Sequence, residues 1–219
     1  MTRKKFSSKR PKFPDSYVGT HAKEYNRQKW MERNQKKTTV CCLTFLFDEK
    51  LGYIKKKDPN ALLIGDLGCG TGYSTEILAE YGFRVLGIDL LFDMITKAKA
   101  RRDRLKDLHY ELIMADITRL PLRTHSLQHI ISVSAYNFIT ASARGKRDQQ
   151  KIMVNTSQSL RKILKKKGRI IIEFYPEDEA ELQEFVDSFT SVGFNGFMVK
   201  DKPHQKGGQT FLLLEKEEV

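Results

Sequence analysis

Apolar and polar positions form a repeating order of strand and helix patterns from residue 61 onward. Short apolar runs predict strands at 61–67, 83–89, 109–115, 127–134 and 168–175. Apolar positions at helical spacing predict helices at 73–81, 91–105, 149–165 and 178–191. Strands that alternate with helices are typical of a parallel sheet covered by helices on both faces. We therefore expect an α/β fold with a Rossmann-like sheet.

The C-terminal part of the chain predicts a different strand arrangement. Two apolar runs, at 196–200 and 210–214, are joined by a link that contains Pro203, Gly207 and Gly208. Turn residues in a short link favour an antiparallel pair at the edge of the sheet. We expect a mostly parallel, seven-stranded sheet with an antiparallel C-terminal strand.

The N-terminal region divides into a tail and a helical segment. Residues 1–14 hold six cations, two prolines and no acid, which predicts a basic disordered tail. Thr20 is a favoured helix cap, and the polar segment after it leads into an apolar run at 38–47. We expect N-terminal helices within 20–50, as part of one domain that covers 15–219.

Length and charge narrow the class of protein. The 219 residues suffice for one domain with a sizeable core. A net charge of +12 and a pI near 9.5 favour a polyanionic partner, nucleic acid before others. Three cysteines and five scattered histidines have neither disulfide nor metal-ligand spacing, so we expect no metal site. No run of eighteen apolar residues and no signal-like segment is present, so the expected location is cytoplasmic.

The segment Asp-Leu-Gly-Cys-Gly-Thr-Gly at 66–72 predicts a cofactor site. A strand that ends in an acid, enters a loop of alternating glycines and opens a helix is the first β–α turn of a nucleotide-type sheet. The third glycine falls one residue earlier than in the dinucleotide pattern. A pyrophosphate prefers bare backbone amides, whereas the ammonium group of S-adenosylmethionine favours a nearby carboxylate. We expect S-adenosylmethionine as the cofactor, in contact with Asp66, Gly68, Cys69, Gly70 and Gly72.

Two further acids end the next two predicted strands. Asp89 lies 21 positions after Gly68, near the spacing at which an acid accepts both ribose hydroxyls. Its alternative role is to cap the helix that follows Leu90. Asp116 can accept from the adenine amino group while Ile117 packs on the ring, although Asp116 taken alone is an ordinary turn residue. We expect Asp89, Leu90, Asp116 and Ile117 to bind the cofactor, because ligands bind at the carboxyl edge of such sheets.

The fourth strand brings candidate acceptor-side residues to the same edge. We expect Ser132 and Ser134 beside the cofactor. Tyr136 or Phe138 can stack on a planar base, and Asn137 can read the edge of that base through its amide. The alternative for the two aromatic residues is core packing.

The acids, the glycine loop and the strand order of residues 60–215 resemble the class I S-adenosylmethionine-dependent methyltransferases. Further features are similar to the family of small-subunit rRNA guanine-N7 methyltransferases, over nearly the whole chain: Tyr17, Ala22, Tyr25, Gln35 and the segments 131–135, 173–176 and 192–196. The resemblance implies a guanine acceptor in rRNA and a lid contact from Tyr25 to the cofactor. It also implies a small zinc-binding activator protein that pairs with the sheet edge, which we expect near Tyr110–Met114.

Two departures from that family affect the expectations. The family usually has an isoleucine-glutamine-tryptophan run where this chain has Tyr136, Asn137 and Phe138, so the target base is less firmly implied. The chain also ends at Val219 without the long basic C-terminal extension of eukaryotic members, which predicts an archaeal relative.

Basic clusters and competing functions complete the expectations. The clusters at 101–106 and 161–167 are interpreted as solvated helix ends. We interpret Arg144, Lys146 and Arg147 as phosphate contacts near the acceptor site, and the alternative is a solvated loop whose charge Asp148 partly balances. The leading hypothesis is methylation of guanine N7 in small-subunit rRNA, which needs no general base because N7 carries a free lone pair. The alternatives are a methyltransferase for a small molecule or other RNA and a non-catalytic ribosome-assembly factor.

Overall fold

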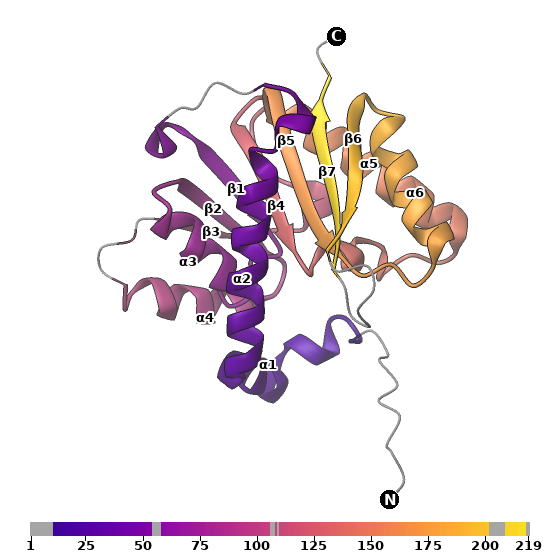
Figure 1. The fold of residues 1–219 in the computed structure, drawn as a ribbon. Helices are drawn as coiled ribbons and strands as arrows, with labels where there is room; N and C mark the ends of the chain where they lie inside the picture. The colour runs from indigo at the N-terminus through magenta and orange to yellow at the C-terminus, as the bar shows by residue number, and fades with distance from the viewer. Residues whose placement is uncertain (1–10, 54–57, 106–107, 109, 202–208, 218–219) are drawn as a thin grey trace, which may run out of the picture.

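Seven strands form one mixed sheet in the computed structural model, which describes residues 11–53, 58–105, 108, 110–201 and 209–217 (Figure 1). The order is β3-β2-β1-β4-β5-β7-β6, with β1 to β5 parallel and β7 antiparallel to both of its neighbours. The predicted sheet and its antiparallel C-terminal strand are thereby confirmed. The strands are β1 (Leu63–Leu67), β2 (Arg84–Asp89), β3 (Tyr110–Met114), β4 (Leu127–Val133), β5 (Leu164–Phe174), β6 (Phe194–Lys200) and β7 (Thr210–Lys216).

Helices cover both faces of the sheet. One face carries α2 (Lys29–Leu46), α3 (Tyr73–Glu80) and α4 (Phe92–Arg102), and the other carries α5 (Lys146–Ile163) and α6 (Glu179–Thr190) (Figure 1). Each face has its own cluster of buried apolar side chains, because strands buried on both sides need a helix layer on each side. The predicted doubly covered sheet is confirmed, with strand and helix ends shifted by a few residues.

The predicted N-terminal helices are present as α1 (Gly19–Arg27) and α2, and α1 lies beyond the carboxyl ends of the parallel strands (Figure 1). Polar contacts hold them to the glycine-loop side of the sheet. The Lys36 ammonium donates to Glu76 at 2.6 Å, and the Tyr73 hydroxyl donates to the Asn26 carbonyl at 3.0 Å. The Gly19 amide donates to the Asp93 carboxylate at 2.7 Å. These contacts fix α1 over the edge where the acids of the parallel strands end.

The opposite end of α2 is fixed by a buried arginine. Arg169 in the middle of β5 is 1% exposed, and its guanidinium donates to the carbonyls of Leu46 and Gly52 at 2.8 and 2.6 Å. It also pairs with the Glu215 carboxylate at 2.7 Å. A buried charge that is paired and hydrogen-bonded in this way is expensive to unpair, so the C-terminal end of α2 is tied to the sheet.

The N-terminal tail is only partly described. Residues 1–10 of the predicted tail lie outside the described residues, so disorder there stays a prediction. Residues 11–14 differ from that prediction, because the ring of Phe13 stacks on Phe138 with centroids 5.3 Å apart. In the part of the chain that the structure describes, no helix is long and apolar enough to cross a membrane.

Candidate functional site

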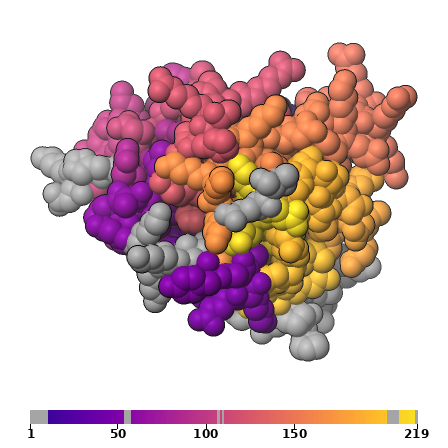
Figure 2. Space-filling model, turned by 90° about the horizontal axis from the view of Figure 1, so that it is seen from above, coloured from indigo at the N-terminus to yellow at the C-terminus, as the bar shows by residue number. Residues whose placement is uncertain are grey.

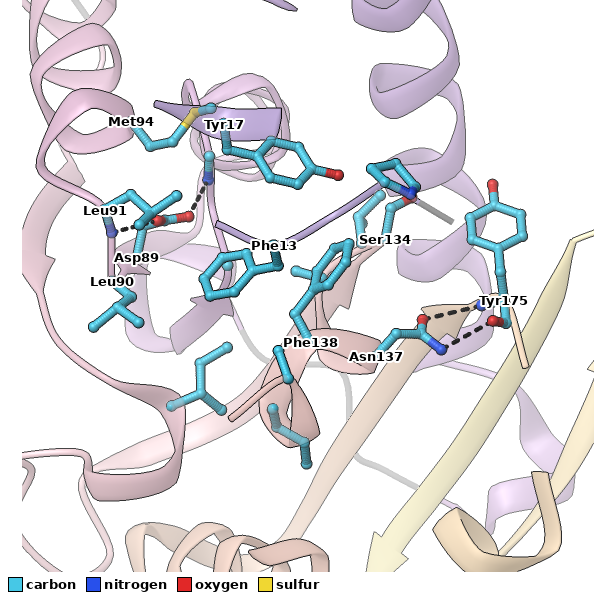
Figure 3. Close-up of a pocket in the computed structure, with 18 of the residues that line it drawn as sticks. Phe13, Tyr17, Asp89, Leu90, Leu91, Met94, Ser134, Asn137, Phe138 and Tyr175 are labelled. Carbon is cyan, nitrogen blue, oxygen red and sulfur yellow. Dashed lines mark hydrogen bonds between the residues drawn. The ribbon is translucent and has the colours of Figure 1, made fainter. Parts of the chain in front are cut away.

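A cavity of about 1590 Å³ lies at the carboxyl edge of the parallel strands, under the N-terminal helices (Figure 3). Its walls come from the segments that follow β1, β2, β3, β4 and β5 and from residues 11–38. Pockets for single small molecules are typically about 300–1,000 Å³. The cavity therefore has room for a cofactor and for part of a second ligand beside it.

Gly68 and Gly70 form the floor of the cavity next to β2. The Gly68 amide donates to the Ile88 carbonyl at 2.8 Å, and an added Cβ at Gly68 would lie 2.1 Å from the Ala135 side chain. Gly70 has a φ of +54° and lines the cavity, and its amide donates to Asp89. Both positions need glycine, the first for close approach and the second for its left-handed backbone. Gly72 does not line the cavity and lies directly before α3. A Cβ added at Gly72 would lie 3.2 Å from the side chain of Ala98.

Asp66 lies buried beneath the loop and Cys69 lies buried within it, and neither residue lines the cavity. One Asp66 oxygen, Oδ2, accepts from the hydroxyls of Ser74 and Thr75 at 2.7 and 2.6 Å. The other, Oδ1, has no hydrogen-bond partner among the described residues. Burial raises the pKa of Asp66 to about 6. Asp66 thus holds the start of α3, and its predicted contact with the cofactor stays a prediction.

Asp89 lines the cavity and combines both predicted roles (Figure 3). Its Oδ1 accepts from the Leu91 amide and its Oδ2 accepts from the Gly70 amide, both at 2.9 Å. A carboxylate has about four acceptor positions, so Asp89 keeps acceptor capacity for a ribose hydroxyl. Burial raises the pKa of Asp89. Burial and the nearby Asp89 charge raise the pKa of Tyr17 to about 12, which keeps its hydroxyl protonated.

The remaining predicted cofactor residues after β2 and β3 also line the cavity. Asp116 accepts at Oδ1 from the amide and the hydroxyl of Thr118, both at 2.8 Å, so its turn role is real. Ile117 and Leu90 form apolar wall beside it. Tyr25 lines the lid side, where its hydroxyl accepts from Gln35 Nε2 at 2.5 Å. A carboxylate between apolar side chains suits an adenine ring, which has a polar edge and flat apolar faces.

The two serines at the end of β4 have different positions. Ser132 is fully buried and its hydroxyl donates to the Leu67 carbonyl at 2.8 Å, so it joins β4 to β1 and does not reach the cavity. Ser134 does line the cavity and has a φ of +55°. Its hydroxyl donates to the buried Glu173 carboxylate at 2.7 Å. Burial raises the pKa of Glu173.

The side chains of the three predicted acceptor-side residues also have different positions. Tyr136 is 1% exposed and packs 5.6 Å from the rings of both Phe185 and Phe189, so the core-packing alternative is correct for it. Asn137 reaches the cavity wall, and each end of its amide already makes one hydrogen bond (Figure 3). Its Nδ2 donates to the Tyr175 carbonyl and its Oδ1 accepts from the Tyr175 amide, both at 3.0 Å. Asn137 thus clamps the segments that follow β4 and β5, and base reading by the remaining positions of its amide stays a prediction.

Phe138 offers its ring to the cavity, together with three aromatic residues that were not among the predicted acceptor residues. Phe13 stacks on Phe138, and Tyr17 meets the Phe138 ring edge-on at 5.6 Å (Figure 3). Tyr175 is half-exposed on the far wall. Phe13 was missed because it lies in a basic segment, where only its aromatic character among prolines signals an ordered contact. These rings form an apolar, flat-walled space next to the predicted cofactor position.

The sequence of this chain is similar to those of known methyltransferases. A family model for a methyltransferase domain matches residues 65–172. The chain is 27% identical over 192 residues to the 18S rRNA (guanine(1575)-N(7))-methyltransferase of Saccharomyces cerevisiae, covering 87% of this chain and 64% of that protein. It is 27% identical over 198 residues to the 18S rRNA (guanine-N(7))-methyltransferase of Mus musculus, covering 90% and 66%. The chain spans about half to two thirds of the length of such relatives.

Solved structures share the fold at low identity. Magnesium protoporphyrin IX methyltransferase from Synechocystis PCC 6803 with bound SAM matches with a TM-score of 0.63 at 16% identity, covering 93% of this chain and 94% of that one. The PH0226 protein from Pyrococcus horikoshii matches with a TM-score of 0.64 at 17% identity, covering 89% and 99%. The relatives with rRNA activity do not bear on the source of this chain, so the archaeal origin stays a prediction.

Proposed function

Because this chain is a class I S-adenosylmethionine-dependent methyltransferase, distantly related to the 18S rRNA guanine-N7 methyltransferases, we propose that it methylates guanine N7 in small-subunit rRNA during ribosome assembly. One observation carries the proposal: the relatives that match 68% to 90% of the chain have this activity in their names, one of them as probable. The flat aromatic space beside the cofactor position supports a planar acceptor.

The chemistry of this acceptor fits the residues of the cavity. When bound, S-adenosylmethionine would supply an electrophilic methyl group on its sulfonium. Guanine N7 has an in-plane lone pair without a proton, which can accept this methyl as the sulfur–methyl bond breaks and S-adenosylhomocysteine leaves. No general base is needed, and no histidine lines the cavity in the described part of the chain. Asp89 and Gly70 hold the cofactor, and Phe138 sets the plane of the base. Such positioning can lower a barrier by roughly 7–11 kcal/mol when the reacting atoms are well aligned.

Exposed cations near the cavity fit an RNA substrate. Lys37 and Arg119 line the cavity, and Arg144, Lys146 and Arg147 are exposed at the start of α5 on the same edge of the sheet. None of these five side chains forms a salt bridge with a described residue. Unpaired cations around an acceptor site bind phosphates and release counterions from RNA.

The proposal includes the zinc-binding activator at the β3 edge. β3 pairs only with β2 among the described residues, so one side of its backbone is open for strand addition. Met114 at the end of β3 is 59% exposed and Phe92 at the start of α4 is 71% exposed. An activator that pairs with this edge would cover both apolar side chains.

Transfer of labelled methyl from S-adenosylmethionine to small ribosomal subunits tests this function, with and without the activator and with mapping of the modified nucleotide. We expect label at a single guanine N7. Label on a protein or small molecule, or no transfer to RNA under either condition, contradicts the proposal. Cofactor binding without transfer would favour the assembly-factor alternative.

A further inference from the structure

Three lysines protrude from the end of the molecule opposite the cofactor cavity. β4 pairs with β5 through Leu127 with Leu164 and then His129 with Arg169, so residues 165–168 face only Gln128. The extra residues of β5 bulge out of the sheet, and Lys165, Lys166 and Lys167 are all exposed. Figure 2 looks onto this amino edge of the sheet, where the start of β5 reaches the surface.

The bulge has a defined shape. Lys167 has a φ of +57°, and an added Cβ at Gly168 would lie 2.8 Å from the Lys165 carbonyl and 2.9 Å from that of Gln128. Gln128 in turn accepts from the Leu63 amide at 2.9 Å. Arg169, the next residue, is buried and fully engaged. The three ammonium groups therefore project from a fixed backbone.

Helix capping does not explain these lysines. Sequence places them at a helix end, but α5 ends at Ile163 and the lysines belong to β5. The carbonyls of Arg161 and Leu164 at that helix end both accept from the ammonium of Lys216 at 2.8 Å. Favourable interaction with the helix dipole is thus already supplied by Lys216.

Further cations surround the bulge. Lys162 is exposed, and its carbonyl accepts a hydrogen bond from the amide of His125, two residues after the exposed Arg123. Lys50 and Lys167 line one shallow depression. We call the amino-edge lysine surface the set Lys50, Arg123, Lys162, Lys165, Lys166 and Lys167. None of these cations forms a salt bridge with a described residue, and the nearby Glu215 is paired with Arg169.

We propose that the amino-edge lysine surface is a second RNA-binding surface, which contacts phosphates of folded small-subunit rRNA remote from the acceptor guanine. The length of β4 separates it from the cavity by about 20 Å at 3.3 Å per residue. A folded RNA that wraps the molecule reaches both ends. Exposed lysines that form no salt bridge with a described residue suit sequence-independent phosphate contact. The inference rests on the proposed function for the identity of the RNA.

Binding to naked, folded small-subunit rRNA at several salt concentrations tests this surface. We expect K165E/K166E/K167E to weaken binding about tenfold or more near 0.15 M salt, because each phosphate contact adds about 0.7–0.9 to the salt slope. The slope should fall by about two. K165R/K166R/K167R should bind as the wild type does, since the charge is kept.

The matched control is K99E/R104E/K151E, which reverses three exposed cations on α4, just after it and on α5. It should keep most of the wild-type affinity. The surface is refuted if the 165–167 reversal binds like the wild type, if the control loses as much, or if the arginine variant also fails.

Methyl transfer separates this inference from the proposed function. At saturating rRNA the 165–167 reversal should keep the wild-type kcat and the wild-type affinity for S-adenosylmethionine, because the bulge is remote from the cavity. A wild-type protein that transfers no methyl to rRNA contradicts the proposed function, while the salt-dependent binding still decides the surface. Loss of kcat or of cofactor affinity in the reversal contradicts a remote surface.

Discussion

Asp89 is the residue on which we expect cofactor binding to depend most directly. It is buried, lines the cavity and accepts from the amides of both Gly70 and Leu91. The loop that carries Gly70 is therefore aligned by the same carboxylate that we expect to bind the ribose. Capping and ribose binding are two uses of one side chain, so the sequence alternatives do not compete.

Asp89→Asn should weaken S-adenosylmethionine binding about tenfold to a hundredfold. The amide of asparagine cannot accept with both terminal atoms, and a hydrogen bond to a charged group contributes about 1.5–3 kcal/mol. Calorimetric titration measures the effect, with the exposed Asp103→Asn as the matched control. Unchanged affinity in Asp89→Asn would remove the ribose assignment.

Asp66 predicts a pH dependence of stability. Burial raises its folded pKa from 3.8 to about 6, so the folded state holds this proton more tightly than the unfolded state. The resulting stabilisation is complete below the unfolded pKa and is lost as pH rises through about 6. Two pKa units correspond to about 3 kcal/mol.

Asp66→Asn should remove that dependence, because an amide does not titrate in this pH range. Its side-chain oxygen can still accept from Ser74 and Thr75. Urea unfolding from pH 4 to 8, spanning the pKa of about 6, should show the variant gaining stability relative to the wild type, with a constant difference above about pH 7. A difference between the two proteins that does not vary with pH would contradict this account.

Residue positions were predicted better than side-chain directions. Strand order and glycine spacing place Gly68, Gly70, Asp89, Asp116 and Phe138 at one edge, and all five line the cavity. The side chains of Ser132, Asp66, Cys69 and Tyr136 turn into the protein instead. Their direction depends on the packing of α3, α5 and α6, which a local pattern does not contain.

At the scale of elements, the clamp between Asn137 and Tyr175 joins the segments that follow β4 and β5. Because Phe138 follows Asn137, the clamp also fixes the position of the Phe138 ring, which faces the acceptor space. Sequence placed Asn137 correctly but could not reveal a partner 38 residues away. Long-range pairs of this kind form only in the folded chain.

Asn137→Ala should lower the free energy of unfolding by about 2 kcal/mol, since two hydrogen bonds of about 1 kcal/mol each are lost. The KM for rRNA should rise while cofactor affinity stays unchanged. Asn155→Ala, an exposed asparagine on α5, is the control. An equal loss of cofactor affinity, or an unchanged KM for rRNA, would contradict a clamp on the acceptor side.

Strands and helices themselves followed from periodicity, with one informative exception. The predicted helix at 149–165 runs two residues too far and the predicted strand at 168–175 starts four residues too late, since β5 begins at Leu164. Pairing with β4 and the burial of Arg169 decide this boundary, and both are tertiary effects. The bulge that results is the element on which the second RNA surface depends.

For the whole molecule, the charge distribution and the cavity support one account. Cations without salt bridges among the described residues lie near the cavity and at the opposite end of the sheet. The β3 edge lies to one side, where an activator would leave both ends open to RNA. This arrangement predicts a methyltransferase that binds a folded rRNA at both ends while one guanine enters the aromatic space.

Replacement of the acceptor guanine by 7-deazaguanine tests the central claim most directly. The analogue keeps the Watson–Crick edge and the ring shape but has a carbon in place of N7. With an rRNA fragment that contains the mapped guanine, we predict efficient methyl transfer, and with the 7-deaza fragment we predict unchanged binding and no transfer. Equal methylation of both fragments would contradict a ring-nitrogen acceptor and the function proposed for this chain.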